Sequence, residues 1–121
     1  DKDLCFLKPS KIFIHPVPLS KSPPSLGDKV YAIAAPFGIS GRNLSLIFNG
    51  YFSGTRNNTR FYTIPTRPGS SGAAVLNDQW EVVGLLHTAF RDLENVGLGT
   101  GLEDIREFLF SPTETIDEKL F

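Results

Sequence analysis

The chain has 121 residues, with 12 basic and 13 acidic side chains and a formal net charge of −1. This length suits one small domain or part of a larger one, and the near-neutral charge gives no support for binding nucleic acid. No apolar run approaches the roughly 20 residues that span a bilayer, so we expect no membrane partner. One cysteine excludes an internal disulfide, and two distant histidines supply no metal-ligand set. We therefore expect no metal and no cofactor.

The first 25 residues predict a short strand and a linker. The chain contains no methionine and starts at Asp1 without a basic-then-apolar signal segment. We expect either a trimmed N-terminus or a piece of a longer precursor. Leu4–Leu7 predicts a short buried strand, and residues 12–14 are another short apolar piece. The proline- and serine-rich residues 20–25 predict a surface crossing. Together, 1–25 are interpreted as a strand that carries an aspartate, followed by a linker.

Six further segments are short, rich in apolar and β-branched residues, and bounded by turn signals, which is typical of antiparallel strands. They are residues 29–35, 43–55, 59–64, 73–76, 81–88 and 97–101. We expect the second of them to bend at Gly50 or Gly54, where glycine permits a bulge. Residues 56–58 predict the hairpin tip that leads into the third.

One segment near the C-terminus has helical spacing. Leu102, Ile105 and Leu109 share one face, and acidic residues near the start of the segment suit a helix N-terminus. We expect the helix to stop at the Ser-Pro step that opens residues 111–121, which form a tail. The sequence thus predicts a small antiparallel β domain over 26–110 with one terminal helix.

One glycine-rich segment is suited to catalysis. It reads Arg67-Pro68-Gly69-Ser70-Ser71-Gly72-Ala73-Ala74-Val75. Gly69 and Gly72 allow the backbone to curl so that consecutive amide groups point into one concavity, as an oxyanion hole requires. With Ser71 as nucleophile, the N–H groups of Gly69 and Ser71 would form that hole. The alternative is an ordinary Gly-Ser turn between two strands, which this motif alone does not exclude.

The segments around this motif add a family resemblance. Gly69–Asn77 followed by Glu81–Leu85 resembles the nucleophile region of chymotrypsin-fold serine peptidases. Leu26–Gly38 resembles the strand that opens their second barrel, particularly in the bacterial high-temperature-requirement branch. Val96–Gly101 and the helix from Leu102 resemble that branch's last strand and terminal helix. The resemblance implies an all-β fold: an antiparallel six-stranded Greek-key barrel, the second barrel of the trypsin-like fold, with a C-terminal helix.

The resemblance also implies an orienting aspartate. In these families an aspartate stands directly before a short apolar strand, as Asp3 stands before Leu4–Leu7. Asp3 would then hold the tautomer of the catalytic histidine; Asp1 is the less favoured alternative, and an ordinary solvated aspartate is another. The family order places that histidine before Asp3, whereas His15 follows it and is interpreted as a structural or surface residue. We therefore expect a partner, an N-terminal barrel chain or fragment that carries the histidine, and little or no activity from this chain alone.

A substrate pocket walled by Thr66, His87, Thr88 and Ala89 is a further implication. Residues 63–67 contain no acidic side chain, so a neutral residue at the cleaved position of a peptide or protein substrate is favoured over Lys or Arg. In some relatives a histidine on this strand helps to recognise Glu or Gln. Here it lies one residue farther from the preceding glycine, and one residue reverses the face of a strand. This spacing favours a structural or backbone-binding role for the histidine.

Two classes of function follow. The first is the C-terminal, nucleophile-bearing portion of a trypsin-like serine endopeptidase, which needs an N-terminal part with the catalytic histidine. The second is a non-catalytic pseudopeptidase scaffold or interaction module. The missing histidine favours the second class, and the intact Gly69–Gly72 run favours the first. A β-barrel binding module unrelated to peptidases would make the ordered resemblance a coincidence.

Overall fold

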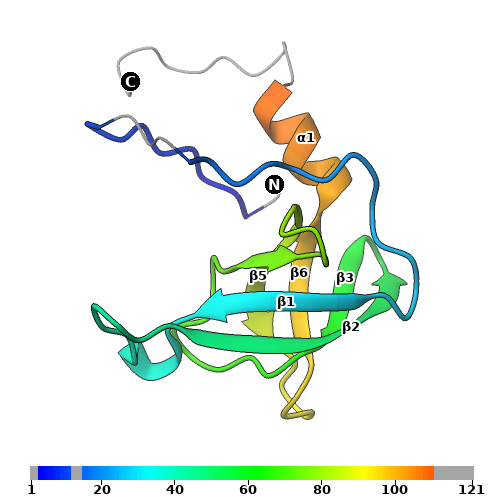
Figure 1. Ribbon diagram of the computed structural model, residues 1–121. Helices are drawn as coiled ribbons and strands as arrows, with labels where there is room; N and C mark the ends of the chain where they lie inside the picture. The colour runs from blue at the N-terminus through cyan, green and yellow to red at the C-terminus, as the bar shows by residue number, and fades with distance from the viewer. Residues whose placement is uncertain (1–2, 12–14, 111–121) are drawn as a thin grey trace.

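The computed structural model describes residues 3–11 and 15–110. Within that part of the chain, six strands close into one antiparallel barrel in the order β1-β2-β3-β6-β5-β4 (Figure 1). The strands are β1 (Lys29–Ala34), β2 (Leu46–Arg56), β3 (Thr59–Thr63), β4 (Ala74–Leu76), β5 (Val82–Ala89) and β6 (Gly97–Gly101). Helix α1 (Leu102–Phe110) follows β6 and lies at one end of the barrel. The expected six-stranded barrel with a C-terminal helix is confirmed.

The barrel interior is filled by alternate side chains of each strand, because successive residues of a strand point to opposite faces. In β1, Val30 and Ala32 are 0% and 1% exposed, whereas Ile33 is 45% exposed. The buried cluster consists of Val30, Ala32, Phe52, Tyr62, Ile64, Val75, Val83 and Leu86. A second cluster of Leu76, Val82 and Ile105 lies where α1 packs on the barrel.

The β2–β3 hairpin turns at Asn57 and Asn58, whose φ angles of 51° and 63° are the left-handed values of a two-residue type I′ turn. Arg56 still pairs with Thr59, so the turn is shorter than the predicted tip. β2 has a register shift beside Gly54, which has φ of 112°. The bend expected at one of two glycines therefore occurs at Gly54.

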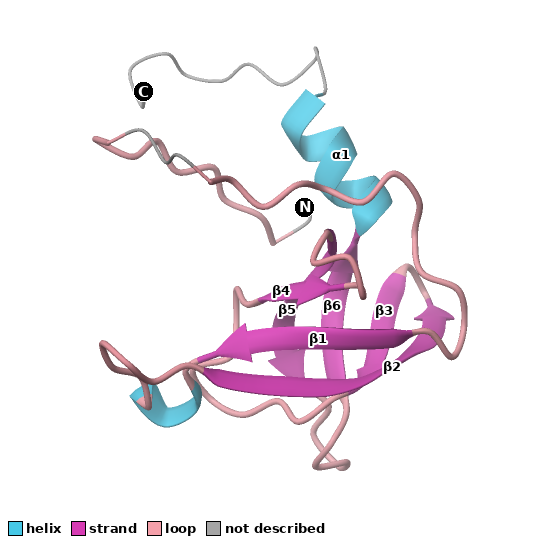
Figure 2. Ribbon diagram, in the orientation of Figure 1, coloured by secondary structure: helices cyan, strands magenta, loops and turns pink. Residues whose placement is uncertain are grey.

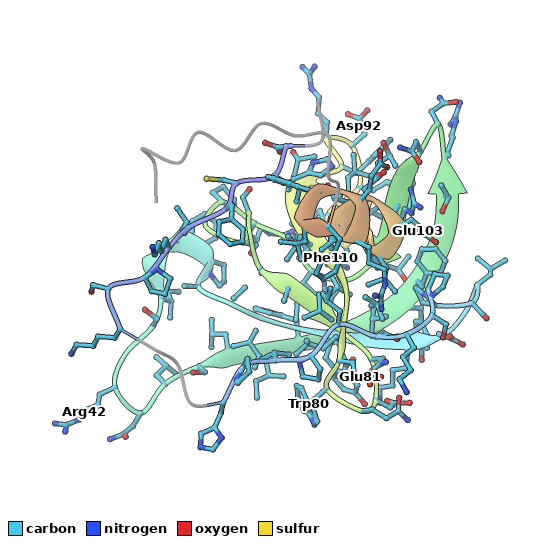
Figure 3. The ribbon with its side chains drawn as sticks, turned by 90° about the horizontal axis from the view of Figure 1, so that it is seen from above. Arg42, Trp80, Glu81, Asp92, Glu103 and Phe110 are labelled. Atoms are coloured by element: carbon cyan, nitrogen blue, oxygen red, sulfur yellow. The ribbon has the colours of Figure 1, made fainter. Side chains whose placement is uncertain are left out.

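The loop between β1 and β2 opens with a short 3₁₀ turn, η1 (Pro36–Gly38), that the sequence did not predict. Figure 2 shows η1 away from α1, at the barrel end where β1 finishes. The rest of this loop projects outward, with Arg42 pointing away from the barrel (Figure 3). The turn matters below because its backbone contacts the loop that carries Ser71.

The strand expected at Leu4–Leu7 is wrong. Residues 3–11 form no strand, and Leu7 is 80% exposed. In the closed barrel the strands already pair with one another along most of their length, so little edge is left for a further strand to join. Farther along, the linker pairs briefly with β5 through a parallel bridge between Leu19 and Val82. The apolar piece at 12–14, the tail 111–121 and the alternative Asp1 lie outside the described residues.

Candidate active site

The loop between β3 and β4 holds Ser71 at its surface. Gly69 and Gly72 have φ of 99° and 88°, the left-handed region that favours glycine. Ser70 between them is 1% exposed, and its amide donates to the Arg67 carbonyl oxygen at 2.9 Å. Ser71 itself is exposed. Ser70 is therefore buried within the loop, and Ser71 is the serine that a substrate can reach.

Backbone hydrogen bonds fix this loop against β5. The Gly72 amide donates to the Leu86 carbonyl oxygen at 2.7 Å, and the Leu86 amide donates to the Ala73 carbonyl oxygen at 2.9 Å. The Ala73 amide donates to the Ser70 carbonyl oxygen at 3.0 Å. By contrast, within the described part of the chain, the amides of Gly69 and Ser71 donate to no acceptor. These two are the donors that the sequence assigned to an oxyanion hole.

A contact from η1 sets the orientation of the Gly69 amide. The Phe37 amide donates to the Pro68 carbonyl oxygen at 2.6 Å. In a trans peptide the C=O and N–H groups point in opposite directions, so the Gly69 N–H faces away from η1. A Cβ on Gly69 would lie 2.5 Å from the Ala35 carbonyl oxygen, which explains why glycine is needed here.

The Ser71 hydroxyl donates to the carbonyl oxygen of His87 at 2.8 Å. His87 lies at a register shift of β5 between Leu86 and Thr88, so the extra residue noted in the sequence is taken up by a bulge. Residue 87 also lines a cavity of about 240 Å³ together with Asp3. One residue of β5 thus contacts the predicted nucleophile through its backbone and shares a cavity with the predicted orienting carboxylate.

Two of the other predicted pocket residues, Thr66 and Ala89, lie next to Gly97, a residue that the sequence did not assign to the pocket. Thr66 is 2% exposed and donates its hydroxyl to the Ile64 carbonyl oxygen at 3.1 Å. A Cβ on Gly97 would overlap the Thr66 hydroxyl oxygen. Gly97 also pairs with Ala89 across β5 and β6, while Ala89 and Thr88 are exposed. The sequence signal for it was the run of alternating glycines at 97–101, which leaves one side of the strand without side chains.

One side chain of the barrel core has a shifted pKa. Burial raises the pKa of the Tyr62 phenol above its usual value.

Among the residues that the structure describes, no three His, Cys, Asp or Glu side chains group closely enough to hold a metal ion. In the same residues, no helix is both long and apolar enough to cross a membrane.

Comparisons with solved structures show the same fold. The inactive form of Rv3671c from Mycobacterium tuberculosis H37Rv gives a TM-score of 0.66 at 13% identity, covering 78% of this chain and 51% of that one. The serine endoprotease from Yersinia pestis gives 0.68 at 24% identity, covering 77% and 34%. The active form of the Rv3671c protease gives 0.65 at 15% identity, covering 78% and 46%. The chain therefore spans about half or less of these proteins.

Sequence comparison gives the family. No curated protein matches the chain, but the family of trypsin-like peptidase domains matches residues 1–85, well over half of its length. This match and the barrel confirm the resemblance to chymotrypsin-fold serine peptidases, over part of such a protein. The chain belongs to the trypsin-like peptidase domain family.

Proposed function

We propose that this chain is the C-terminal, nucleophile-bearing portion of a serine endopeptidase. The observation that carries the proposal is the exposed Ser71 hydroxyl on a loop whose Gly69 and Ser71 amides have no acceptor among the described residues. Amides that are free beside a serine can receive the negative charge that develops on an attacked carbonyl oxygen. An N-terminal part supplies the histidine, and Asp3 orients it.

In this mechanism the Ser71 oxygen bonds to the carbonyl carbon of the substrate while its proton passes to the histidine. The carbonyl oxygen becomes negative and accepts hydrogen bonds from the amides of Gly69 and Ser71. When the tetrahedral intermediate collapses, the C–N bond breaks and the departing amine takes the proton from the histidine. Water then attacks the acyl ester by the same route and restores the serine.

The hydrogen bond from Ser71 to His87 does not oppose this chemistry. A neutral hydrogen bond contributes about 1 kcal/mol net, so the catalytic histidine of the N-terminal part can displace the His87 carbonyl oxygen as acceptor of the Ser71 proton at small cost. This cost is small beside the about 3 to 4 kcal/mol that one oxyanion donor contributes in the transition state.

The specificity that we propose is for a neutral side chain at the cleaved position. The support is the absence of acidic residues in 63–67 and the small residues Thr66, Ala89 and Gly97 that lie together. A cationic side chain would find no carboxylate from this loop. His87 instead shares its cavity with Asp3, which supports a role near the orienting carboxylate over one in the specificity pocket.

Labelling with a fluorophosphonate probe tests the proposal. The native assembly, N-terminal part included, is treated with the probe and the modified residue is located by mass spectrometry. We expect the label on Ser71, its loss in Ser71→Ala, and full labelling in the control Ser40→Ala, which changes an exposed serine of the β1–β2 loop. A folded assembly that stays unlabelled would instead support the pseudopeptidase scaffold.

A further inference from the structure

Arg67 connects the Ser71 loop to the loop between β5 and β6. One guanidinium nitrogen, Nη1, donates to the Thr66 carbonyl oxygen at 3.1 Å and also to the carbonyl oxygen of Glu94. The other, Nη2, lies 3.9 Å from the Glu94 carboxylate. The planar guanidinium can hold several acceptors at once because its donors are fixed in a fork. Its side chain therefore spans two loops that are 27 residues apart in the sequence.

The backbone of Arg67 is tied to the residue before the nucleophile. Its carbonyl oxygen accepts from the Ser70 amide at 2.9 Å, and its amide donates to the Ser70 hydroxyl at 3.4 Å. Pro68, the next residue, is held by the Phe37 amide. A displacement of Arg67 would therefore move the peptide that presents the Gly69 N–H.

The loop on the other side has few attachments of its own. Residues 91–95 are exposed. The loop is closed by the Phe90 amide, which donates to the Val96 carbonyl oxygen at 2.8 Å, and Phe90 packs on Phe61 with ring centroids 6.0 Å apart. Among the described residues, Arg67 makes the polar contact between this loop and the Ser71 loop. The loop continues directly from Thr88 and Ala89, the predicted pocket residues.

The carboxylate of Glu94 contributes less than its carbonyl oxygen. Its side chain is 88% exposed, against 38% for Arg67, and the separation of 3.9 Å is long for a hydrogen-bonded pair. Exposed ion pairs add little because water screens them. A charged donor on a carbonyl oxygen is the stronger interaction, so the tether depends on the arginine and on the backbone of residue 94.

We propose that Arg67 is a positioning residue that couples the loop between β5 and β6 to the oxyanion-hole amides. The inference extends the proposed function, since it assigns Arg67 to the same site. A substrate residue that orders the loop after Ala89 would, through Arg67, also order the peptide that presents the Gly69 amide.

Hydrogen exchange tests the coupling without any need for activity. In the full-length protein, Arg67→Ala should raise amide exchange about tenfold or more in peptides that cover 68–72 and in those that cover 90–96, because one charged hydrogen bond is lost. Arg67→Lys should give an intermediate rise, since a single ammonium replaces the fork. Glu94→Gln and the exposed control Arg42→Ala should exchange as the wild type does. If Arg67→Ala leaves residues 68–72 unchanged, the coupling is refuted.

Kinetics then tests the role in catalysis. Loss of an interaction made only in the transition state lowers kcat and kcat/KM equally. We expect Arg67→Ala to lower both by about tenfold or more, with partial rescue by Arg67→Lys, an unchanged pH profile and an unchanged Arg42→Ala control. A raised KM with unchanged kcat would show that Arg67 serves only the pocket and would overturn the inference. If wild-type Ser71 never reacts with the fluorophosphonate, the proposed function fails, and the exchange result still decides the coupling.

Discussion

Gly69 and Gly72 flank Ser71 with similar left-handed φ angles of 99° and 88°, but their surroundings differ. A Cβ on Gly69 would meet the Ala35 carbonyl oxygen at 2.5 Å and the Phe37 amide nitrogen at 3.0 Å. A Cβ on Gly72 would meet nothing within 4 Å. An alanine at either position would therefore strain the backbone, but only an alanine at position 69 would also clash with η1 and Ala35.

This difference predicts unequal effects of two alanine substitutions. Gly69→Ala should push the 68–69 peptide away from η1 and slow labelling of Ser71 by about 100-fold or more, the effect of losing one oxyanion donor. Gly72→Ala should cost about 1 to 2 kcal/mol of stability through backbone strain and should change labelling far less. Probe labelling rates and thermal melts of both variants provide the measurement. Equal labelling rates in the two variants would contradict the assigned geometry.

For single elements, the sequence predicts which segments form strands or a helix, but not the contacts that they make with distant segments. The strands and α1 follow from apolar spacing, because each element buries one face. Leu4–Leu7 carries the same apolar signal but forms no strand, because the barrel strands already pair with one another along most of their length. The position of His87 was equally hidden: its spacing suggested a reversed face, and only the pairing with β6 reveals the bulge.

The candidate site divides in the same way. Gly69, Ser71 and Gly72 were recognisable from the sequence because glycine marks unusual backbone geometry. Arg67 and η1 could not be recognised, because their importance comes from contacts with loops far along the chain. The carbonyl oxygen of Glu94 that Arg67 contacts lies 27 residues away in the sequence, so no local pattern predicts this contact.

β3 and β5 meet across the barrel interior at Tyr62 and Gly84. Tyr62 is 0% exposed, and its hydroxyl has no hydrogen-bond partner among the described residues. A Cβ on Gly84 would overlap that hydroxyl oxygen, so the glycine makes room for the phenol. Burial without a partner disfavours the phenolate, and this effect raises the pKa of Tyr62 against a smaller opposing effect of the Arg60 charge.

The raised pKa of Tyr62 predicts a loss of stability at high pH. Above about pH 10 the phenol ionises in the unfolded chain but stays protonated in the folded one. The unfolded state then binds fewer protons, so the free energy of unfolding falls as pH rises, by up to about 1.4 kcal/mol per pH unit from this group. Tyr62→Phe should remove that contribution and, at neutral pH, change the free energy of unfolding by less than about 1 kcal/mol.

Urea unfolding of the full chain between pH 7 and pH 11 measures this slope. Tyr51, whose side chain is 55% exposed, provides the matched control Tyr51→Phe, which should reproduce the wild-type curve. A Tyr62→Phe curve that stays parallel to the wild type above pH 10 would contradict the prediction.

Over the whole molecule, the barrel is closed but its surface is not uniformly polar. Ile33 and Ile47 are cross-strand partners on the outer face of β1 and β2 and are 45% and 59% exposed. Phe37, Ile39 and Leu44 of the adjoining loop are 69%, 47% and 46% exposed. Exposed apolar groups gathered on neighbouring elements are typical of interaction surfaces. This face adjoins η1, which holds the Pro68 carbonyl oxygen, so a partner bound there would lie next to the candidate site.

The proposed division of catalytic groups between two parts predicts complementation. In the isolated chain the Ser71 hydroxyl donates to a backbone oxygen and not to a base, and loss of the base costs on the order of a million-fold in kcat in serine peptidases. The 121-residue chain should therefore hydrolyse peptides negligibly. Circular dichroism and thermal melting should show that it is nevertheless folded. Adding a separately produced N-terminal part that carries the histidine should restore hydrolysis, saturably with its concentration.

Variants of the 121-residue chain identify which groups it contributes to the restored activity. Ser71→Ala should restore none, because the nucleophile is absent. Asp3→Asn should restore a rate lower by about 10⁴-fold, since an amide holds the wrong tautomer of the histidine. Asp28→Asn, which alters a carboxylate that accepts from the Ser25 amide at 2.8 Å, is the matched control and should restore the full rate. Hydrolysis by the isolated wild-type chain at the rate of the mixture would show that the base lies within these residues and would remove the need for a second part.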